Sequence, residues 1–231
     1  MLDFDRFGVL TFDCYGTLID WESGILGAVR PVFARYSVGA DDRQILETYA
    51  ELEAEHEAGK YVNYETVLRL VMDGMSHRFH FEADPEELGC LARSMAKWEP
   101  FSDTIDALRR FKSRYKLAVV SNVDDRLFAR TAGRLGVPFD WVVTAEQVHA
   151  YKPSLAVFER ALEEIGYPPR RVLHVAQSVY HDIIPARSIG LSAVWVNRRE
   201  GKEGSGATLP ASASPDLVVR DLEMLARLAG V

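Results

Sequence analysis

Six short apolar runs, several of them rich in valine, set the strongest constraint on the fold. They lie at residues 7–12, 116–120, 141–144, 171–175, 192–196 and 216–219. Runs that are apolar on both faces are typical of strands covered on both sides. Stretches of helical periodicity separate them, for example Leu155, Phe158, Leu162 and Ile165. Alternating strands and helices predict an α/β protein with a doubly wound parallel sheet.

Residues 20–98 interrupt this alternation. They contain helical patterns such as Ile45 and Tyr49, and no convincing strand. We therefore predict an inserted all-helical cap domain at residues 20–98 and a core domain formed by residues 1–19 and 99–231. Because the insert follows the first strand directly, we expect it over the carboxyl end of the sheet, where α/β folds place their chemistry.

Two local patterns within this organisation give specific predictions. The sequence Asp84-Pro85-Glu86-Glu87 supplies an N-cap acid, a proline in the first turn and a glutamate that can close a capping box. It predicts a helix start near residue 85. The segment 198–215 is rich in glycine, serine, alanine and proline, and it is interpreted as a mobile surface loop.

Composition limits the cellular setting and the partners. A hydrophobic fraction of 48% and a mean hydropathy of -0.09 are typical of a soluble globular protein. The formal net charge of -7 repels nucleic-acid backbones and anionic membranes, and no apolar run approaches the ~18 residues of a membrane span. The two cysteines, Cys14 and Cys90, lack metal-ligand spacing and fit a reducing compartment. We expect a cytoplasmic protein with no nucleic-acid and no membrane partner.

Polar residues follow the predicted strands where each strand ends. They are Asp13 after the first strand, Ser121 and Asn122 after the second, Lys152 before a helix, and Ser178 and Asp182 after the strand at 171–175. The carboxyl ends of parallel strands meet at one edge of a sheet, so these side chains are expected to lie together. A carboxylate there, with a lysine and a hydroxyl beside it, forms a nucleophile with electrostatic support.

The order of these motifs resembles the haloacid dehalogenase superfamily over essentially the whole chain. The motifs are Asp13-Cys14-Tyr15-Gly16-Thr17, Ser121-Asn122, Lys152-Pro153 and the loop that carries Asp182. Most members are magnesium-dependent phosphatases, with a second aspartate where this chain has Tyr15 and a metal-binding acid where Gln177 aligns. A phosphate ester needs an acid for its leaving group and a cation, whereas a halide leaves as a stable anion. The Asp-x-Tyr form resembles the type II 2-haloacid dehalogenases, which implies no metal and no cofactor.

The resemblance implies hydrolytic dehalogenation of a small anionic substrate, a short 2-haloacid. Asp13 attacks the carbon that bears the halogen and forms an alkyl ester, and water then hydrolyses the ester to a 2-hydroxy acid of inverted configuration. Lys152 pairs with Asp13 and keeps it ionised. Thr17 orients Asp13 by a hydrogen bond. Asp182 is the candidate that activates or positions the water.

Substrate-binding roles also follow from the resemblance. Ser121 and Asn122 are expected to hold the substrate carboxylate, Tyr15 to form a wall of the site, and Ser178 to take a position in the last motif. The cap arginine of these enzymes, which helps to receive the halide, has no clear counterpart, and the cap cations Arg43 and Lys60 are interpreted as solvated surface residues. The family analogy also suggests a homodimer.

Two other functions stay open at this stage. In the first, Asp13 and Asp182 bind magnesium and the protein is a phosphatase for a small phosphate ester. In the second, the chain is a binding or scaffold protein that lost its chemistry, although intact Asp13 and Lys152 argue against this. The acidic run at residues 51–57 is interpreted as a solvated helix face, and Trp21 as a core residue.

Overall fold

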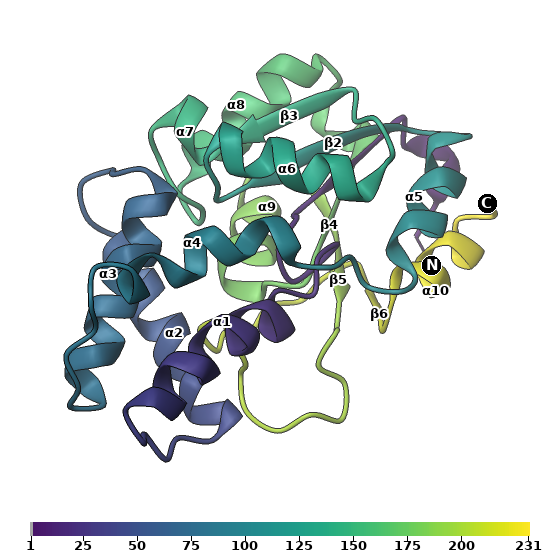
Figure 1. Cartoon of the computed structure of the whole chain (residues 1–231). Coiled ribbons are helices and arrows are strands. Elements are labelled where there is room, and N and C mark those ends of the chain that lie inside the picture. Colours follow the sequence, from purple (N-terminus) through teal and green to yellow (C-terminus); the bar gives the residue numbers. More distant parts are fainter. Residues whose placement is uncertain (1) are drawn as a thin grey trace.

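A six-stranded parallel sheet forms the centre of the computed structural model, which describes residues 2–231 (Figure 1). Its strands are β1 (Val9–Phe12), β2 (Lys116–Ser121), β3 (Trp141–Thr144), β4 (Val172–Ala176), β5 (Ser192–Val196) and β6 (Leu217–Val219). The strand order is β3-β2-β1-β4-β5-β6, and all neighbours are parallel. The chain winds outward from β1 in one direction and then returns to wind in the other. The predicted doubly wound α/β fold is confirmed, with every strand at its expected position.

The alternating side chains of the central strands face two separate cores. In β1, Leu10 and Phe12 belong to one apolar cluster, whereas Val9 belongs to another on the opposite face. The first cluster includes side chains of α5 (Thr104–Lys112), α6 (Asp125–Leu135) and α10 (Leu222–Leu228), and the second includes those of α8 (Leu155–Ile165) and α9 (Ile184–Ser188). Successive strand residues point to opposite faces, so a strand between two helical layers must be apolar throughout.

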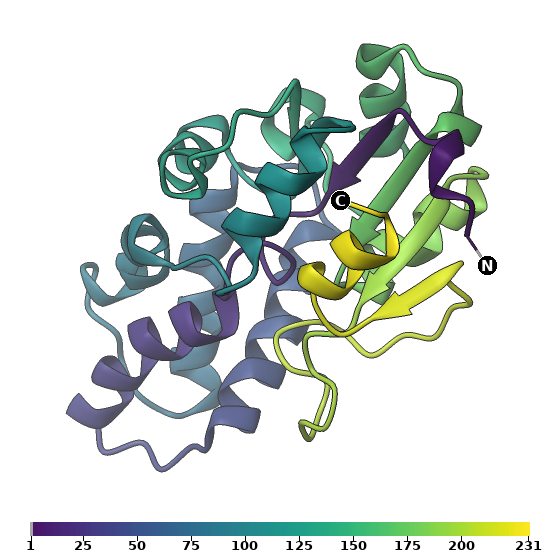
Figure 2. The same ribbon diagram turned by 90° about the vertical axis from the view of Figure 1, so that its right-hand side faces the viewer.

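Helices between β1 and α5 lie beyond the carboxyl end of the sheet (Figures 1 and 2). They are α1 (Trp21–Arg35), α2 (Asp42–Glu57), α3 (Tyr64–Arg78) and α4 (Cys90–Ser94), with the short 3-10 helices η2 (Glu87–Gly89) and η3 (Met95–Lys97). We call α1 to α4 the cap helices. Their presence confirms the predicted helical insert.

The chain leaves the sheet for the cap helices and returns from them at adjacent points. The backbone N–H of Asp20 donates to the carbonyl of Glu99 at 2.9 Å, and Ile19 forms a bridge with Pro100. We propose that these crossings bound a cap domain at residues 20–98. Both crossings lie close to the loop that follows β1, so the cap helices are fixed beside that loop.

The predicted helix start near residue 85 is only partly correct. Asp84 Oδ1 accepts hydrogen bonds from the backbone N–H groups of Glu86 and Glu87, and Glu87 Oε2 accepts from Asp84 N, so the capping box forms. However, residues 87–89 form a 3-10 turn, and the α-helix begins only at Cys90. Arg35 of α1 also donates to the Glu87 carboxylate at 2.7 Å, which ties this turn to a neighbouring helix.

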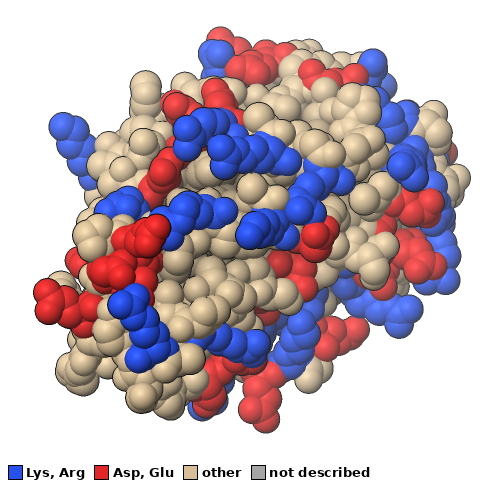
Figure 3. Space-filling view, viewed as in Figure 1, with Lys and Arg blue, Asp and Glu red and all other residues tan. Residues whose placement is uncertain are grey.

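Short elements complete the core. They are η1 (Phe4–Arg6), α7 (Ala145–Val148), η4 (Pro169–Arg171) and the π-helical turn η5 (Val179–Ile183). Figure 3 shows basic and acidic side chains mixed over one face of the molecule, with Lys and Arg gathered near its middle. Within residues 2–231, no helix combines the length and the apolar character that crossing a bilayer requires.

The segment 198–215 is not simply a surface loop. Arg198 donates to both carboxylate oxygens of Asp103 at 2.8 and 3.0 Å and to the carbonyl of Thr17 at 2.9 Å. Arg199 pairs with Glu22 of α1 at 2.5 Å, and Thr208 is buried. Small residues here allow the backbone to approach the cap helices closely. The composition predicted a solvent-exposed loop, but two arginines anchor the segment to the loop after β1 and to the cap helices.

Asp124 connects the core to a cap helix. Its two carboxylate oxygens accept hydrogen bonds from the backbone N–H groups of Tyr64 at 2.7 Å and Glu65 at 3.0 Å, the first residues of α3. Asp124 is buried, and the positive end of the helix dipole favours a carboxylate at this point.

We expect Asp124→Ala to lower the free energy of unfolding by about 2 kcal/mol, because two buried donors lose a charged acceptor. Urea denaturation measures the change. Asp106→Ala is the matched control: Asp106 is 75% exposed and forms only an (i, i+4) pair with Arg110. Equal losses in the two variants would contradict a special role for Asp124.

Candidate active site

Asp13 lies at the centre of the site, directly after β1. It is buried, and its backbone N–H donates to the carbonyl of Val175 in β4 at 3.2 Å. The chain then turns at Gly16, whose φ is +91°; a Cβ atom there would lie 2.9 Å from Trp21 Nε1. Only glycine fits this turn. The turn returns Thr17 to the aspartate, and Thr17 Oγ1 donates to Asp13 Oδ2 at 2.7 Å.

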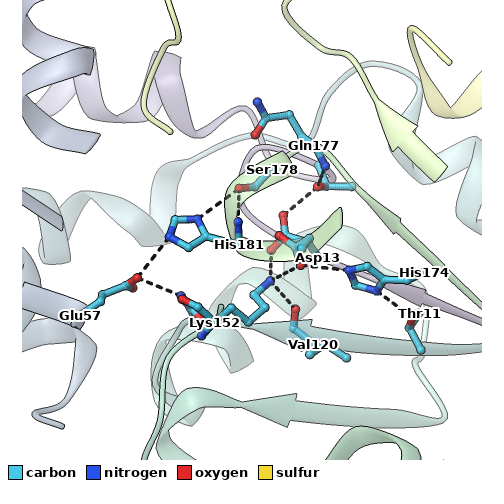
Figure 4. A network of polar contacts seen from close by, with 12 residues as sticks. Thr11, Asp13, Glu57, Val120, Lys152, His174, Gln177, Ser178 and His181 are labelled. Atoms are coloured by element: carbon cyan, nitrogen blue, oxygen red, sulfur yellow. Dashed lines mark hydrogen bonds and ion pairs between the residues drawn. The ribbon is translucent and has the colours of Figure 1, made fainter. Parts of the chain in front are cut away.

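Lys152 holds the other oxygen of Asp13 (Figure 4). Its Nζ donates to Asp13 Oδ1 at 2.8 Å, to Asp182 Oδ1 at 2.7 Å and to the carbonyl of Val120 at 3.0 Å. The side chain is 1% exposed. An ammonium group has three donors, so all of them are used within the protein.

Asn122 fixes the backbone at Lys152 from both sides. Its Oδ1 accepts from Lys152 N at 2.7 Å, and its Nδ2 donates to Lys152 O at 3.1 Å. The loop after β2 therefore holds the lysine in place at the end of the neighbouring strand. This use of the amide was not foreseen from the sequence, which suggested that Asn122 faces the substrate.

A buried chain of polar groups supports the lysine. His174 Nε2 lies 3.0 Å from Asp182 Oδ1, and His174 Nδ1 lies 2.9 Å from Thr11 Oγ1 (Figure 4). His174 and Asp182 have no exposed surface. The chain therefore runs from Thr11 through His174, Asp182 and Lys152 to Asp13, across β1 and β4. His174 was not predicted as a site residue, although a histidine within an otherwise apolar strand is a sequence signal for a buried polar contact.

Burial and charge act against each other on these groups. Burial raises the pKa of Asp13, and the nearby Lys152 partly opposes this rise. Burial also works to raise the pKa of Asp182, but Lys152 and His174 hold it below its ordinary value. Burial works to lower the pKa of Lys152, yet the two aspartates raise it above its ordinary value. Lys152 is therefore an ammonium and Asp182 a carboxylate at neutral pH.

A small cavity opens beside Asp13. Its lining residues are Asp13, Tyr15, Trp21, Glu53, Glu57, Tyr64, Ser121, Asn122, Lys152, Ser178, His181, Asp182 and Thr208. The cavity lies between the carboxyl ends of β1, β2 and β4 and the cap helices. Ser121 is 1% exposed, and its hydroxyl has no hydrogen-bond partner among residues 2–231. This hydroxyl is free to bind a ligand.

Seven of the eight residues predicted for the site line this cavity, and Thr17 lies behind Asp13. The hydroxyl of Tyr15 is hydrogen-bonded to Thr131 Oγ1 at 2.8 Å, so Tyr15 contributes a ring wall. Ser178 Oγ accepts from the backbone N–H of His181 at 2.9 Å and begins the π-helical turn η5. Arg43 and Lys60 are exposed and do not line the cavity.

Glu53 and Glu57 overturn the interpretation of residues 51–57 as a solvated face. Glu53 is buried, and its Oε1 accepts from the hydroxyls of Tyr49 at 2.8 Å and Tyr64 at 2.6 Å. The Glu57 side chain is 4% exposed and accepts from Asn122 Nδ2 at 3.0 Å. The signal was present, because Glu53 and Glu57 follow the apolar Tyr49 at helical spacings of four and eight.

The four other lining residues outside the predicted set come from four separate segments. Trp21 begins α1, Tyr64 begins α3, His181 lies in η5, and Thr208 belongs to the segment 198–215. Burial lowers the pKa of His181 to about 4, so its ring is neutral at pH 7. Trp21 is a core residue, as interpreted from sequence, and it also forms part of the cavity wall.

The donor set around Asp13 is arranged about a cation that the protein itself supplies. The carboxylates of Asp13 and Asp182 converge on the ammonium of Lys152, and Gln177 stands at the position aligned with the usual metal-binding acid. In the part of the chain that the structure describes, no cluster of three His, Cys, Asp or Glu residues is arranged to hold a metal. The cation that faces the Asp13 carboxylate is the ammonium of Lys152.

Glu53 gives the protein a testable pH dependence. Burial raises the pKa of Glu53 to about 7, from an ordinary value of 4.5. A group whose pKa is raised on folding stabilises the protein below its unfolded pKa, and that stability is lost as the pH rises through about 7. We expect the stability advantage of wild type over Glu53→Gln to fall between pH 5 and 8, by up to about 1.4 kcal/mol per pH unit.

Urea denaturation at four pH values between 5 and 8 measures this difference. Glu55→Gln is the control, because Glu55 lies on the same helix and is exposed. A difference between wild type and Glu53→Gln that stays constant with pH would show that Glu53 does not titrate in this range.

The chain is similar to curated proteins and to solved structures over much of its length. An (S)-2-haloacid dehalogenase of Pseudomonas putida is 27% identical over 221 residues, covering 92% of each chain. A glyceraldehyde 3-phosphate phosphatase of Methanothermobacter thermautotrophicus is 38% identical over 101 residues, covering 42% of this chain and 45% of that protein. The L-2-haloacid dehalogenase structure from Xanthobacter autotrophicus shares the fold, with a TM-score of 0.79 at 21% identity over 97% of this chain and 98% of that one.

The family model described as haloacid dehalogenase-like hydrolase matches residues 7–190. This range contains Asp13, Ser121, Lys152 and Asp182, and it includes the whole of the cap helices. The model therefore covers most of the chain and all four motifs that meet at the cavity. The chain belongs to the haloacid dehalogenase-like hydrolase family.

Proposed function

We propose that this hydrolase is a metal-independent dehalogenase of short 2-haloacids. The observation that carries the proposal is the state of Asp13, a buried carboxylate held at one oxygen by Lys152 and at the other by Thr17, at the wall of the cavity under the cap helices. The relative from Pseudomonas putida, which aligns over nearly the whole chain, supports this choice of reaction.

In the first step, a carboxylate oxygen of Asp13 attacks the carbon that bears the halogen. The carbon–halogen bond breaks, the halide leaves with the bonding electrons, and an alkyl ester forms on Asp13. A halide needs no proton to leave, which suits a site where Tyr15 takes the place of a second acid. Lys152 holds the Asp13 carboxylate in a fixed orientation. Less conformational entropy of the Asp13 side chain is therefore lost when the reaction begins.

In the second step, water attacks the carbonyl carbon of the Asp13 ester. The ester bond breaks, the water oxygen stays on Asp13, and the 2-hydroxy acid leaves with the proton. Asp182 is our candidate for holding this water. Its Oδ1 binds Lys152 and His174, whereas its Oδ2 is buried without a partner among the described residues. As an ionised carboxylate, Asp182 can accept a hydrogen bond from the water.

Ser121 is the residue best placed to bind the substrate carboxylate. Its hydroxyl is buried, lines the cavity and has no partner among the residues described. Asn122 is less suited to bind the substrate carboxylate, because its Nδ2 already donates to Glu57 and to the Lys152 carbonyl. The substrate carboxylate therefore depends on Ser121 and on backbone N–H groups nearby.

The proposed reaction predicts which substrate the protein turns over and where water oxygen goes. We expect halide release from L-2-chloropropionate and not from the D form, unchanged by EDTA or by added magnesium. Asp13→Asn should lower the rate by at least about 10³-fold, because the nucleophile is lost. In water labelled with oxygen-18, turnover should place the label on Asp13, which peptide mass spectrometry detects.

Two outcomes would overturn the proposal. EDTA-sensitive phosphate release from p-nitrophenyl phosphate, without halide release from either form, would establish the phosphatase alternative. Halide release without labelling of Asp13 would show that water attacks the substrate directly.

The second prediction separates two roles of Asp182. If Asp182 positions water, Asp182→Asn slows ester hydrolysis, and mixing with L-2-chloropropionate gives a burst of about one halide per protein before slow turnover. If Asp182 only holds Lys152, formation of the ester slows instead and no burst appears. Rapid-quench measurement of halide distinguishes these results, and Thr17→Ser, which keeps its hydroxyl, is the control.

A further inference from the structure

A second cavity, partly open to solvent, adjoins the first on the side of Glu57. Glu57, Lys152 and His181 line both cavities, so the two share a wall. The second cavity lies between the end of α2 and the loop after α7, and its other lining residues include Tyr61, Tyr151 and Tyr180. The proposed dehalogenation leaves this second space unused.

The Glu57 carboxylate is only half satisfied within the protein. Its Oε2 accepts from Asn122 Nδ2 at 3.0 Å and lies 3.5 Å from His181 Nε2 (Figure 4). Its Oε1 is buried and has no hydrogen-bond partner among residues 2–231. A buried carboxylate oxygen without a donor is unfavourable by about 1–3 kcal/mol, so such an atom calls for an explanation. A ligand that donates to it provides one.

Aromatic rings line the same cavity as this carboxylate. The rings of Tyr61 and Tyr151 are 5.3 Å apart, and the ring of His149 is 5.1 Å from that of Tyr61. The hydroxyl of Tyr61 is also buried without a partner in the described chain. A carboxylate next to tyrosine faces is the surface that binds organic ammonium groups, through charge and through cation–π attraction.

The charged residues of the two cavities also favour a cationic ligand. Lys152 is the single Lys or Arg that lines either cavity in residues 2–231, and its three donors are already bound. Four carboxyl groups face it, from Asp13, Asp182, Glu53 and Glu57. A simple haloacid leaves Glu57 Oε1 without a donor. A substrate that also carries an ammonium group supplies this donor together with a second positive charge among the carboxyl groups.

We propose that the substrate carries an ammonium group, which binds to Glu57 and the Tyr61–Tyr151 pair in the second cavity while its carbon–halogen end lies at Asp13. The substrate class is thus a 2-haloacid with a terminal ammonium group. The position of the reacting carbon in this inference rests on the proposed function. The binding of the ammonium group to Glu57 is independent of the proposed function.

Binding of the cation also moves a proton. Burial raises the pKa of Glu57 well above its ordinary value, with Glu53 adding to the rise and Lys152 opposing it. Around Glu57 lie His181 from η5, neutral at pH 7, and the amide of Asn122 after β2. An ammonium ion stabilises the ionised carboxylate, so Glu57 releases its proton when the cation binds.

Calorimetry with n-butylammonium tests the binding without any turnover. We expect saturable binding to the wild-type protein, at least about tenfold weaker binding to Glu57→Gln, and unchanged binding to Glu55→Gln, whose side chain is exposed on the same helix. Titration in two buffers of different ionisation enthalpy should show proton release. Equal binding to wild type and Glu57→Gln, or preferential binding of butyrate, overturns the inference.

Turnover tests the substrate class. Terminal ammonium 2-chloroacids of three to six carbons are compared with the uncharged chain analogues, and we expect one length to raise kcat/KM at least about tenfold in wild type but not in Glu57→Gln. If no chloroacid releases halide while butylammonium binds, the proposed reaction fails and the cation site stands. If 2-chloropropionate is turned over and butylammonium does not bind, the cation site alone fails.

Discussion

The buried ammonium group of Lys152 is the interaction on which the rest of the site depends. It joins Asp13 at the end of β1, Asp182 in the turn after β4 and the carbonyl of Val120 in β2. Two carboxylates 1% and 8% exposed would be strongly destabilising without this cation. The same contact that stabilises the buried aspartate also holds it in the orientation that the proposed nucleophile needs, so stability and the proposed chemistry depend on one group.

The cap helices determine what reaches that nucleophile. Asp124 anchors the start of α3 to the core, and Arg198 and Arg199 tie the segment 198–215 to the loop after β1 and to α1. The cap helices bring Glu53 and Glu57 to the wall of the cavity that Asp13 lines. In the proposed reaction, the cap therefore supplies the charge on the side of the cavity that faces the reacting carbon.

Much of the fold followed from sequence because its signals are local. Each strand carries its own apolar run, and the helices between them show their own periodicity, so neither prediction needed long-range contacts. Because the carboxyl ends of parallel strands meet at one edge of a sheet, the sequence also predicted that Asp13, Ser121 and Lys152 lie close together. It could not tell that Asn122 clamps the lysine backbone, or that Thr208 reaches the cavity from a glycine-rich segment, because those contacts join residues far apart in the chain.

By itself, the sequence determined the doubly wound sheet, the helical insert and the residues that follow each strand. Apolar periodicity and the succession of strands and helices are local features of the chain, so they can be read without knowledge of distant contacts. Only the tertiary structure decided the charge of the site. Glu53 and Glu57 look like solvated acids when read along α2, and they become buried cavity walls because α2 packs its Tyr49 face toward the sheet edge. Burial depends on which faces meet, and that is a property of packing between segments distant in sequence.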